Sequence, residues 1–245
     1  MAIPRYYVVA ESLHEIQNPT SAEKLVLLGE RIGLGPHSRV LDIASGRGGP
    51  ALLLARTFEC TVDGIELSPD FHAVAVGRAA ERGLSQLVAF RLADASQEEL
   101  PGAAFDAALC LGASFVYGGL DRTIDALAPA VRPGGYVVVG EPYWRKQPLP
   151  ADYEERDEPF TSLEETVHLF ERTGLRVVSV IASSEDDWDR YETLHWLAVE
   201  EWLVTNGDDP ETDEIRARSG HWKRVYLRHG RDHLGWAIIV GWKRP

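Results

Sequence analysis

Short apolar runs alternate with helical stretches along most of this chain. Runs that suit buried strands precede residue 141 at 40–43, 61–66, 88–92, 104–111 and 136–140. Stretches with helix signals lie around them at 20–32, 51–56, 68–83 and 121–130. Because strand and helix alternate regularly, the pattern favours an α/β fold with a parallel, doubly wound sheet.

The expected helices have recognisable ends. Thr20 and Glu23 are spaced as a capping box, and Gly33 ends the helix that they begin. Ser68 is a suitable cap for a later helix, and Pro69 fits its first turn, where a missing N–H costs nothing. These signals support the alternation deduced from the apolar runs.

The last third of the chain departs from this alternation. A helix at 162–174 and a strand at 175–182 are followed by about fifty residues before the final strand at 236–242, which is long for a connection. Ser184 begins a helix with an aromatic face at helical spacing, formed by Trp188, Tyr191, His195 and Trp202. We therefore expect a single domain, 1–245, with an N-terminal cap and helix at 1–35 and a helical insertion at 183–233 that forms a lid.

Composition narrows the possible partners. The chain has 245 residues, 44% hydrophobic and 26% charged, with a formal net charge of −13. This charge repels polyanions and anionic lipids, so we expect no nucleic-acid partner and no membrane partner. No segment reaches the roughly eighteen apolar residues of a membrane span, and the first residues lack a signal-peptide pattern. A cytoplasmic location is expected, and the oligomeric state is left open.

The cysteines and histidines give no metal signature. Cys60 and Cys110 are too few for a disulfide framework, and both fall in expected strands, where buried thiols are common. The eight histidines are scattered, without the paired spacing or the cysteine partners of a zinc site. We therefore expect no metal.

A glycine-rich turn follows the first expected strand. Gly46 and Gly48 allow positive φ angles and close approach of a ligand to the backbone, and Ala51 completes a spacing that dinucleotide sites share. The glycines alone therefore do not choose the ligand. Asp42 does, because a carboxylate four residues before Gly46 could hold an ammonium group, which S-adenosylmethionine (SAM) has and NAD lacks.

Two further acids follow the next two strands. Glu66 lies twenty residues after Gly46, at the end of the 61–66 strand, where its carboxylate can accept hydrogen bonds from both ribose hydroxyls. NAD enzymes share this feature. Asp94 follows the 88–92 strand and could accept a hydrogen bond from an adenine amino group. The carboxyl ends of parallel strands share one edge, so these acids are expected around one ligand.

Together these motifs resemble those of the class I SAM-dependent methyltransferases, as do the segments 105–110 and 131–136. The resemblance covers about residues 20 to 182 and the final strand, and the whole chain is most similar to a bacterial branch of unassigned acceptor. It implies a Rossmann-like, seven-stranded sheet, mostly parallel with an antiparallel last strand, and SAM as cofactor. It also implies a cofactor site formed by Asp42, Ser45, Gly46, Gly48, Glu66, Leu67, Asp94, Ala95 and Leu111.

Candidate acceptor residues follow the fourth and fifth strands and lie near the N-terminus. Glu141 could be a general base or hold a cation, although a carboxylate that merely orders its loop is an equal alternative. Tyr143 and His14 are the other catalytic candidates. An acceptor site could be lined by aromatic and imidazole groups that could equally be core packing, namely Tyr117, Trp144, Trp188, Tyr191 and His195.

Three functions are compatible with this sequence. The leading hypothesis is a methyltransferase that moves the methyl group of SAM to a small-molecule acceptor by in-line displacement. The second is an NAD-dependent oxidoreductase on a similar sheet, because the glycine spacing is shared. The third is a non-enzymatic module that binds SAM or docks a partner protein through the aromatic insertion.

Overall fold

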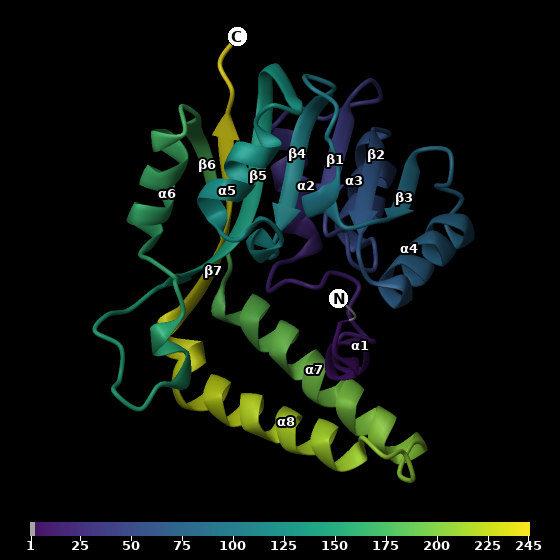
Figure 1. Cartoon of the computed structure of the whole chain (residues 1–245), viewed down its shortest axis with the longest axis vertical. Helices are drawn as coiled ribbons and strands as arrows, with labels where there is room; N and C mark the ends of the chain where they lie inside the picture. Colours follow the sequence, from purple (N-terminus) through teal and green to yellow (C-terminus); the bar gives the residue numbers. More distant parts are fainter. Residues whose placement is uncertain (1–2) are drawn as a thin grey trace.

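A seven-stranded sheet forms the centre of the protein. The computed structural model describes residues 3–245, and its strands follow the order β3-β2-β1-β4-β5-β7-β6 (Figure 1). Their bounds are β1 Arg39–Ile43, β2 Thr61–Glu66, β3 Val88–Leu92, β4 Phe105–Leu111, β5 Val131–Trp144, β6 Arg176–Ala182 and β7 Leu234–Trp242. The chain order reverses between β1 and β4, which is the switch point where doubly wound sheets bind ligands.

The pairing is mixed, as the sequence predicts. Strands β1 to β5 are paired in parallel, whereas β7 is antiparallel to both β5 and β6. The expected end of the fifth strand at residue 140 is wrong. The strand β5 continues to Trp144 because β7 begins early, and Leu234 pairs with Trp144. Glu141 and Tyr143 are therefore held in a strand and not in a loop.

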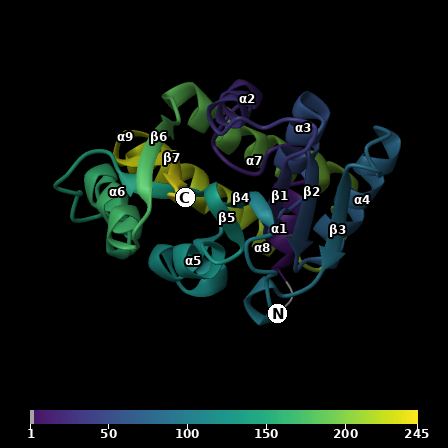
Figure 2. The same cartoon turned by 90° about the horizontal axis from the view of Figure 1, so that it is seen from above.

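Helices cover both faces of the sheet (Figure 2). One face packs against α2 (Ala22–Arg31), α3 (Gly49–Phe58) and α4 (Pro69–Glu81), and the other packs against α5 (Leu120–Leu127) and α6 (Leu163–Arg172). Alternate strand residues point to opposite faces. Val40 and Val138 accordingly join the first core, whereas Leu41 and Val139 join the second. The free thiols of Cys60 and Cys110 are buried, as expected.

The helix caps match most of the sequence signals. Ser68 accepts a hydrogen bond from the N–H of Phe71, and Ser162 and Glu165 form a complete capping box. The first expected cap is wrong by one residue. Ser21, and not Thr20, caps α2 by accepting a hydrogen bond from the N–H of Lys24.

A helical layer lies across the carboxyl edge of the parallel strands. It contains α1 (Arg5–Ala10), α7 (Glu185–Thr205), α8 (Thr212–Val225), the π-helical turn η4 (Tyr226–Gly230) and α9 (Arg231–His233). Figure 1 shows α7 and α8 side by side below the end of the sheet to which β4 points, with α1 against α7. No helix among residues 3–245 is long and apolar enough to cross a membrane.

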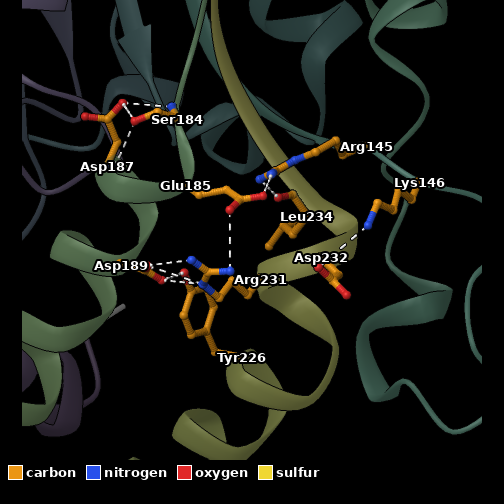
Figure 3. A network of polar contacts seen from close by, with 10 residues as sticks. All are labelled: Arg145, Lys146, Ser184, Glu185, Asp187, Asp189, Tyr226, Arg231, Asp232 and Leu234. Carbon is orange, nitrogen blue, oxygen red and sulfur yellow. Dashed lines mark hydrogen bonds and ion pairs between the residues drawn. The ribbon is translucent and has the colours of Figure 1, made fainter.

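Polar contacts hold the start of α7 against the end of η4 and α9 (Figure 3). Asp189 accepts hydrogen bonds from the Tyr226 hydroxyl at 2.7 Å and from Arg231 Nε at 3.0 Å. Glu185 lies 3.3 Å from Arg145 and 3.4 Å from Arg231. The helical layer is thus tied to the final strand at one end.

Candidate functional site

The glycine-rich turn between β1 and α3 has the backbone shape that its sequence predicts. Gly46 and Gly48 have φ angles of 56° and 79°, in the left-handed region that glycine adopts without strain. Pro50 lies in the first turn of α3. Residues 14–18 cross this turn, and Gln17 Oε1 accepts a hydrogen bond from the Arg47 N–H at 2.6 Å. A side chain at Gly46 would collide with Gln17. The turn is therefore covered by the segment that follows α1.

Asp42 lies at the end of β1 and is buried, with 2% of its surface exposed. Burial, together with the charge of Glu66, raises the pKa of Asp42 to about 7. Its Oδ2 atom has no hydrogen-bond partner among the described residues. A buried carboxylate without a partner is costly, so a ligand that brings a positive charge or N–H donors would stabilise this position.

Glu66 ends β2 on the neighbouring strand. Its Oε2 accepts a hydrogen bond from the Gly46 N–H at 2.8 Å, and its Oε1 accepts one from the Ser68 N–H at 2.7 Å. Burial raises the pKa of Glu66, although these N–H groups oppose the shift. Each carboxylate oxygen keeps a second lone pair, so the orientation fixed by the backbone leaves room for two hydroxyl donors.

The third acid lies beyond β3. Asp94 Oδ1 accepts hydrogen bonds from the Ser96 N–H and hydroxyl, and it caps the short helix η1 (Ala95–Gln97). Tyr117, in the short helix η2 (Ser114–Tyr117), donates a hydrogen bond to the Ala95 carbonyl at 3.3 Å. Leu67, which follows Glu66 in the chain, has an exposed side chain. Tyr117, an acceptor candidate from the sequence, thus lies against a predicted cofactor residue.

These residues fit an aminoacyl nucleoside. Two buried polar atoms at the β1 end, Asp42 Oδ2 and Ser45 Oγ, have no partner among residues 3–245. At the β4 end, Leu111 is followed by Gly112, whose Cβ position is blocked by Asn18. Acids therefore stand at the tips of adjacent strands, with unstrained glycines between them. An ammonium group, a ribose and an adenine ring would find one matching group each.

A hollow lies beside this site at the ends of β4 and β5. We call it the strand-end hollow; its volume is about 700 Å³, and its lining includes Gly112, Ser114, Glu141, Pro142 and Phe160. Burial raises the pKa of Glu141 to about 7, although a hydrogen bond with the Ser114 side chain opposes the shift. Glu141 Oε1 has no partner within the described chain. Such a carboxyl group can exchange a proton near neutral pH.

A second cavity lies between the helical layer and the segment 154–160. We call it the acidic cavity; its volume is about 420 Å³, and its carboxylates are Glu11, Glu155, Glu158 and Glu192. Glu158 and Phe160 line both this cavity and the strand-end hollow. The two spaces therefore adjoin, so a molecule held among the helices lies next to the strand ends.

The aromatic candidates from the sequence divide into two groups. Tyr191 and His195 line the acidic cavity. Trp144 and Trp188 are buried in the core, where their rings pack against Phe160 at 5.3 Å and Tyr226 at 6.3 Å. Tyr143 lies in β5, with its ring over Gly235 of β7. None of these three side chains lines the strand-end hollow or the acidic cavity.

The fold brings two histidines together with Glu11. His14 Nε2 lies 2.9 Å from the Tyr191 carbonyl oxygen, and His195 Nε2 lies 3.0 Å from Glu11 Oε1. Burial acts to lower the pKa of His195, yet the hydrogen bond with Glu11 outweighs it and raises that pKa. Ligand atoms of these three groups lie within 4.8 Å of one another, close enough to surround a metal ion. No local sequence motif predicts this cluster, because Glu11 and His195 are 184 residues apart.

The comparisons with known proteins agree with this geometry. A family model for a methyltransferase domain matches residues 40–135. The structure of a SAM-dependent methyltransferase from Geobacter sulfurreducens, in complex with S-adenosyl-L-homocysteine, matches with a TM-score of 0.93 and 37% identity, covering 99% of each chain. This chain belongs to the class I SAM-dependent methyltransferases.

Two more relatives of this methyltransferase extend over the whole chain. A SAM-dependent methyltransferase from Thiobacillus denitrificans, also in complex with S-adenosyl-L-homocysteine, has a TM-score of 0.92 and 35% identity over 100% of both chains. YjhP from Escherichia coli K12 is 35% identical over 245 residues, which is 98% of each chain. The helical layer is therefore part of what these relatives share with this methyltransferase.

Several residues of the candidate site belong to no sequence motif. Gln17 lies over Gly46 in the turn between β1 and α3, and Asn18 lies over Gly112 at the end of β4. Glu11, directly after α1, and Glu192, on α7, line the acidic cavity. Their spacing to the strand motifs is long and irregular, so only the fold brings them to the site. An acid on the aromatic face of the 184–202 helix was the one available signal for Glu192.

Proposed function

We propose that this methyltransferase transfers the methyl group of SAM to a small-molecule acceptor by in-line displacement. One observation supports this most: the buried Asp42, with an unpartnered Oδ2 and a pKa raised to about 7, next to Glu66 oriented by two backbone N–H groups. Asp42 suits an ammonium group and Glu66 suits a ribose, and the two carboxylates lie on adjacent strands, so that one ligand can reach both. The NAD alternative gives Asp42 no such partner.

In this proposal, the residues of the cofactor site bind different parts of SAM. Asp42 and the backbone near Ser45, Gly46 and Gly48 hold the amino-acid end of SAM, and Glu66 holds the ribose. Leu67, Asp94, Ala95 and Leu111 surround the adenine and the adjoining strand tip. Bound SAM supplies an already activated methyl group, so the protein gains most of its rate by holding both reactants at near-attack distance.

The acceptor enters through the adjoining cavities in this proposal. Glu141 faces the strand-end hollow and takes the proton that the acceptor loses, because a carboxyl group with a pKa of about 7 accepts protons at neutral pH. The insertion at 183–233 and the cap at 1–35 act together as a lid within one domain. The lid excludes water and orders the acceptor. Tyr143, whose ring lies over Gly235, and His14, whose ring lies 4.4 Å from that of His195, line neither cavity and take no direct part in the proton transfer.

Calorimetry of the purified full chain tests this proposal. SAM and S-adenosylhomocysteine are expected to bind with a Kd on the order of micromolar, and NADH is expected to show no heat. Asp42→Ala should weaken both cofactor ligands, whereas Asp125→Ala on the exposed side of α5 should not. If the wild-type protein binds neither sulfur nucleoside, the proposal fails.

A further inference from the structure

The acidic cavity has a chemical character that the methyltransferase assignment does not explain. Four glutamates reach it from three separate segments, with Glu11 directly after α1, Glu192 on α7, and Glu155 and Glu158 in the 154–160 segment. Among the lining residues that the structure describes there is no lysine and no arginine, and His195 is the one imidazole. The cavity therefore concentrates four acidic side chains in a partly buried place.

Burial and mutual repulsion disfavour the ionised forms of Glu192 and Glu155. Burial raises the pKa of Glu192 to about 7; nearby His195 opposes that shift, and the charges of Glu155 and Glu11 add to it. Glu155 accepts a hydrogen bond from the Tyr153 hydroxyl at 2.6 Å, and burial raises its pKa as well. Glu11 is over nine-tenths buried; its Oε1 atom accepts a hydrogen bond from the Tyr191 hydroxyl and lies 3.0 Å from His195 Nε2. His195 offsets the charge of Glu11, whereas Glu192 and Glu155 form no ion pair among the described residues, so a cation that joined them would stabilise their ionised forms.

The remaining wall of the cavity is aromatic. Tyr6, Tyr7, Tyr191, Trp196, Trp222 and Tyr226 line it. The protein already places its own cations on these rings: Arg218 lies 4.9 Å from the Tyr6 ring centre, and Lys223 lies 4.6 Å from that of Trp196. Aromatic faces with nearby carboxylates attract organic ammonium groups, because the ring face is the negative pole of its quadrupole.

We infer that the acceptor of this methyltransferase carries an organic ammonium group, which is bound in the acidic cavity by Glu192 and Glu155 beside Glu11. The ammonium group anchors the molecule, while a separate nucleophilic group near Glu141 loses its proton to that carboxylate and takes the methyl group. This inference rests on the proposed function, since it identifies the molecule that the lid holds. A volume of about 420 Å³ accommodates an amine with an aromatic or branched body. Because Glu158 and Phe160 also line the strand-end hollow, the rest of such a molecule reaches toward Glu141.

Matched probes separate charge from shape. The full chain, both free and saturated with S-adenosylhomocysteine, is titrated with 2-phenylethylamine, 2-phenylethanol and 3-phenylpropionate, which share a phenyl body and differ in the charge of the head group. The amine is expected to bind at least about tenfold more tightly than the alcohol, as expected for a charge-assisted hydrogen bond. Equal binding of the three probes, preference for the alcohol or the acid, or no binding at all would overturn the inference.

The variant Glu192→Gln tests the residue directly. It should remove most of the amine preference while leaving alcohol binding and S-adenosylhomocysteine binding unchanged, and a thermal melt checks that it folds. The matched control is Glu200→Gln, an exposed glutamate on the same helix, which should behave as wild type. If the Glu192 variant keeps the full amine preference, the assignment to this cavity is wrong.

Two further outcomes are distinguishable. If the wild-type protein does not bind S-adenosylhomocysteine, the proposed function is wrong. If it binds S-adenosylhomocysteine but does not prefer the amine, only this inference is wrong.

The cluster of Glu11, His14 and His195 offers a different ligand, a divalent metal ion. Titration with ZnCl₂ that shows tight, EDTA-reversible binding at one ion per chain, together with loss of amine preference, would replace the amine with a metal.

Discussion

The proposed cofactor half of the site and the proposed acceptor half are built in different ways. In the cofactor half, Asp42 and Glu66 lie at the ends of adjacent parallel strands, and the backbone N–H groups of Gly46 and Ser68, in the turns after these strands, orient Glu66. In the acceptor half, Glu11 and Glu192 come from helices that meet only after the chain has folded. The first half is a property of the sheet, and the second is a property of the layer that covers it.

This difference explains what each half can tolerate. Strand tips in a parallel sheet are fixed by the hydrogen bonds of the ladder, so a group there is positioned without help from distant residues. The helical layer is held by side-chain contacts such as those of Asp189, which can change with sequence. Proteins that share this sheet but differ in the helical layer are therefore expected to bind the same cofactor and different acceptors.

The largest expected effect comes from Asp42→Asn, which separates stability from binding. The affinity for S-adenosylhomocysteine should fall on the order of 100-fold, because a charged hydrogen-bond partner is lost. The ligand-free protein should at the same time become more stable. The pKa of Asp42 is raised from 3.8 to about 7, so its burial costs stability that grows as the pH rises between these values and is constant above them.

Calorimetry and thermal melts from pH 4 to pH 8 measure both changes. The gain in melting temperature over wild type should reach several degrees at pH 8, since each pKa unit corresponds to about 1.4 kcal/mol. Asp125→Asn, an exposed change on α5, serves as the control. A variant that binds the nucleoside as wild type does would show that Asp42 has no part in the cofactor site.

Glu141→Gln sharpens the comparison from the acceptor side. Its pKa, like that of Asp42, is raised by burial to about 7, so the variant should also gain stability as the pH rises from 4.5 to 7 and keep that gain above pH 7. The affinity for S-adenosylhomocysteine should stay within about twofold of wild type, because Glu141 faces the hollow beyond the cofactor residues. Methyl transfer to an accepted amine should fall on the order of 100-fold.

The measurements are melts, calorimetry and a coupled assay that detects S-adenosylhomocysteine. Glu171→Gln, an exposed glutamate on α6, is the matched control. Should Glu141→Gln weaken the nucleoside as strongly as Asp42→Asn does, the two halves share this carboxylate and the division between them is wrong.

The sequence predicts the two halves of this methyltransferase unequally for a physical reason. Strand patterns, turn glycines and acids at strand ends are local signals, so the sheet and the positions of Asp42 and Glu66 follow from short windows. The end of β5 was missed because its partner β7 is about ninety residues away in the chain, and pairing across such a distance leaves no local mark. Glu11 and Gln17 were missed for the same reason, as their partners lie on α7 and in the cofactor turn.

The smallest expected effect is Asp189→Asn, which tests how firmly the helical layer is attached (Figure 3). The change keeps the size of the side chain and removes the charge that pairs with Arg231. The free energy of unfolding should fall by about 1 kcal/mol, because the carboxylate is partly exposed and solvent weakens the ion pair. Urea denaturation measures this loss, with the exposed Asp208→Asn as control.

The same variant separates the halves once more. The affinity for S-adenosylhomocysteine should be unchanged, since the strand tips do not depend on Asp189. The affinity for 2-phenylethylamine should fall severalfold, because Tyr226 lines the acidic cavity and its hydroxyl then donates to a neutral amide oxygen, a weaker acceptor than the carboxylate. If the variant lost affinity equally for S-adenosylhomocysteine and 2-phenylethylamine, the helical layer would position the cofactor as well. The helical layer and the sheet would then form one cooperative site.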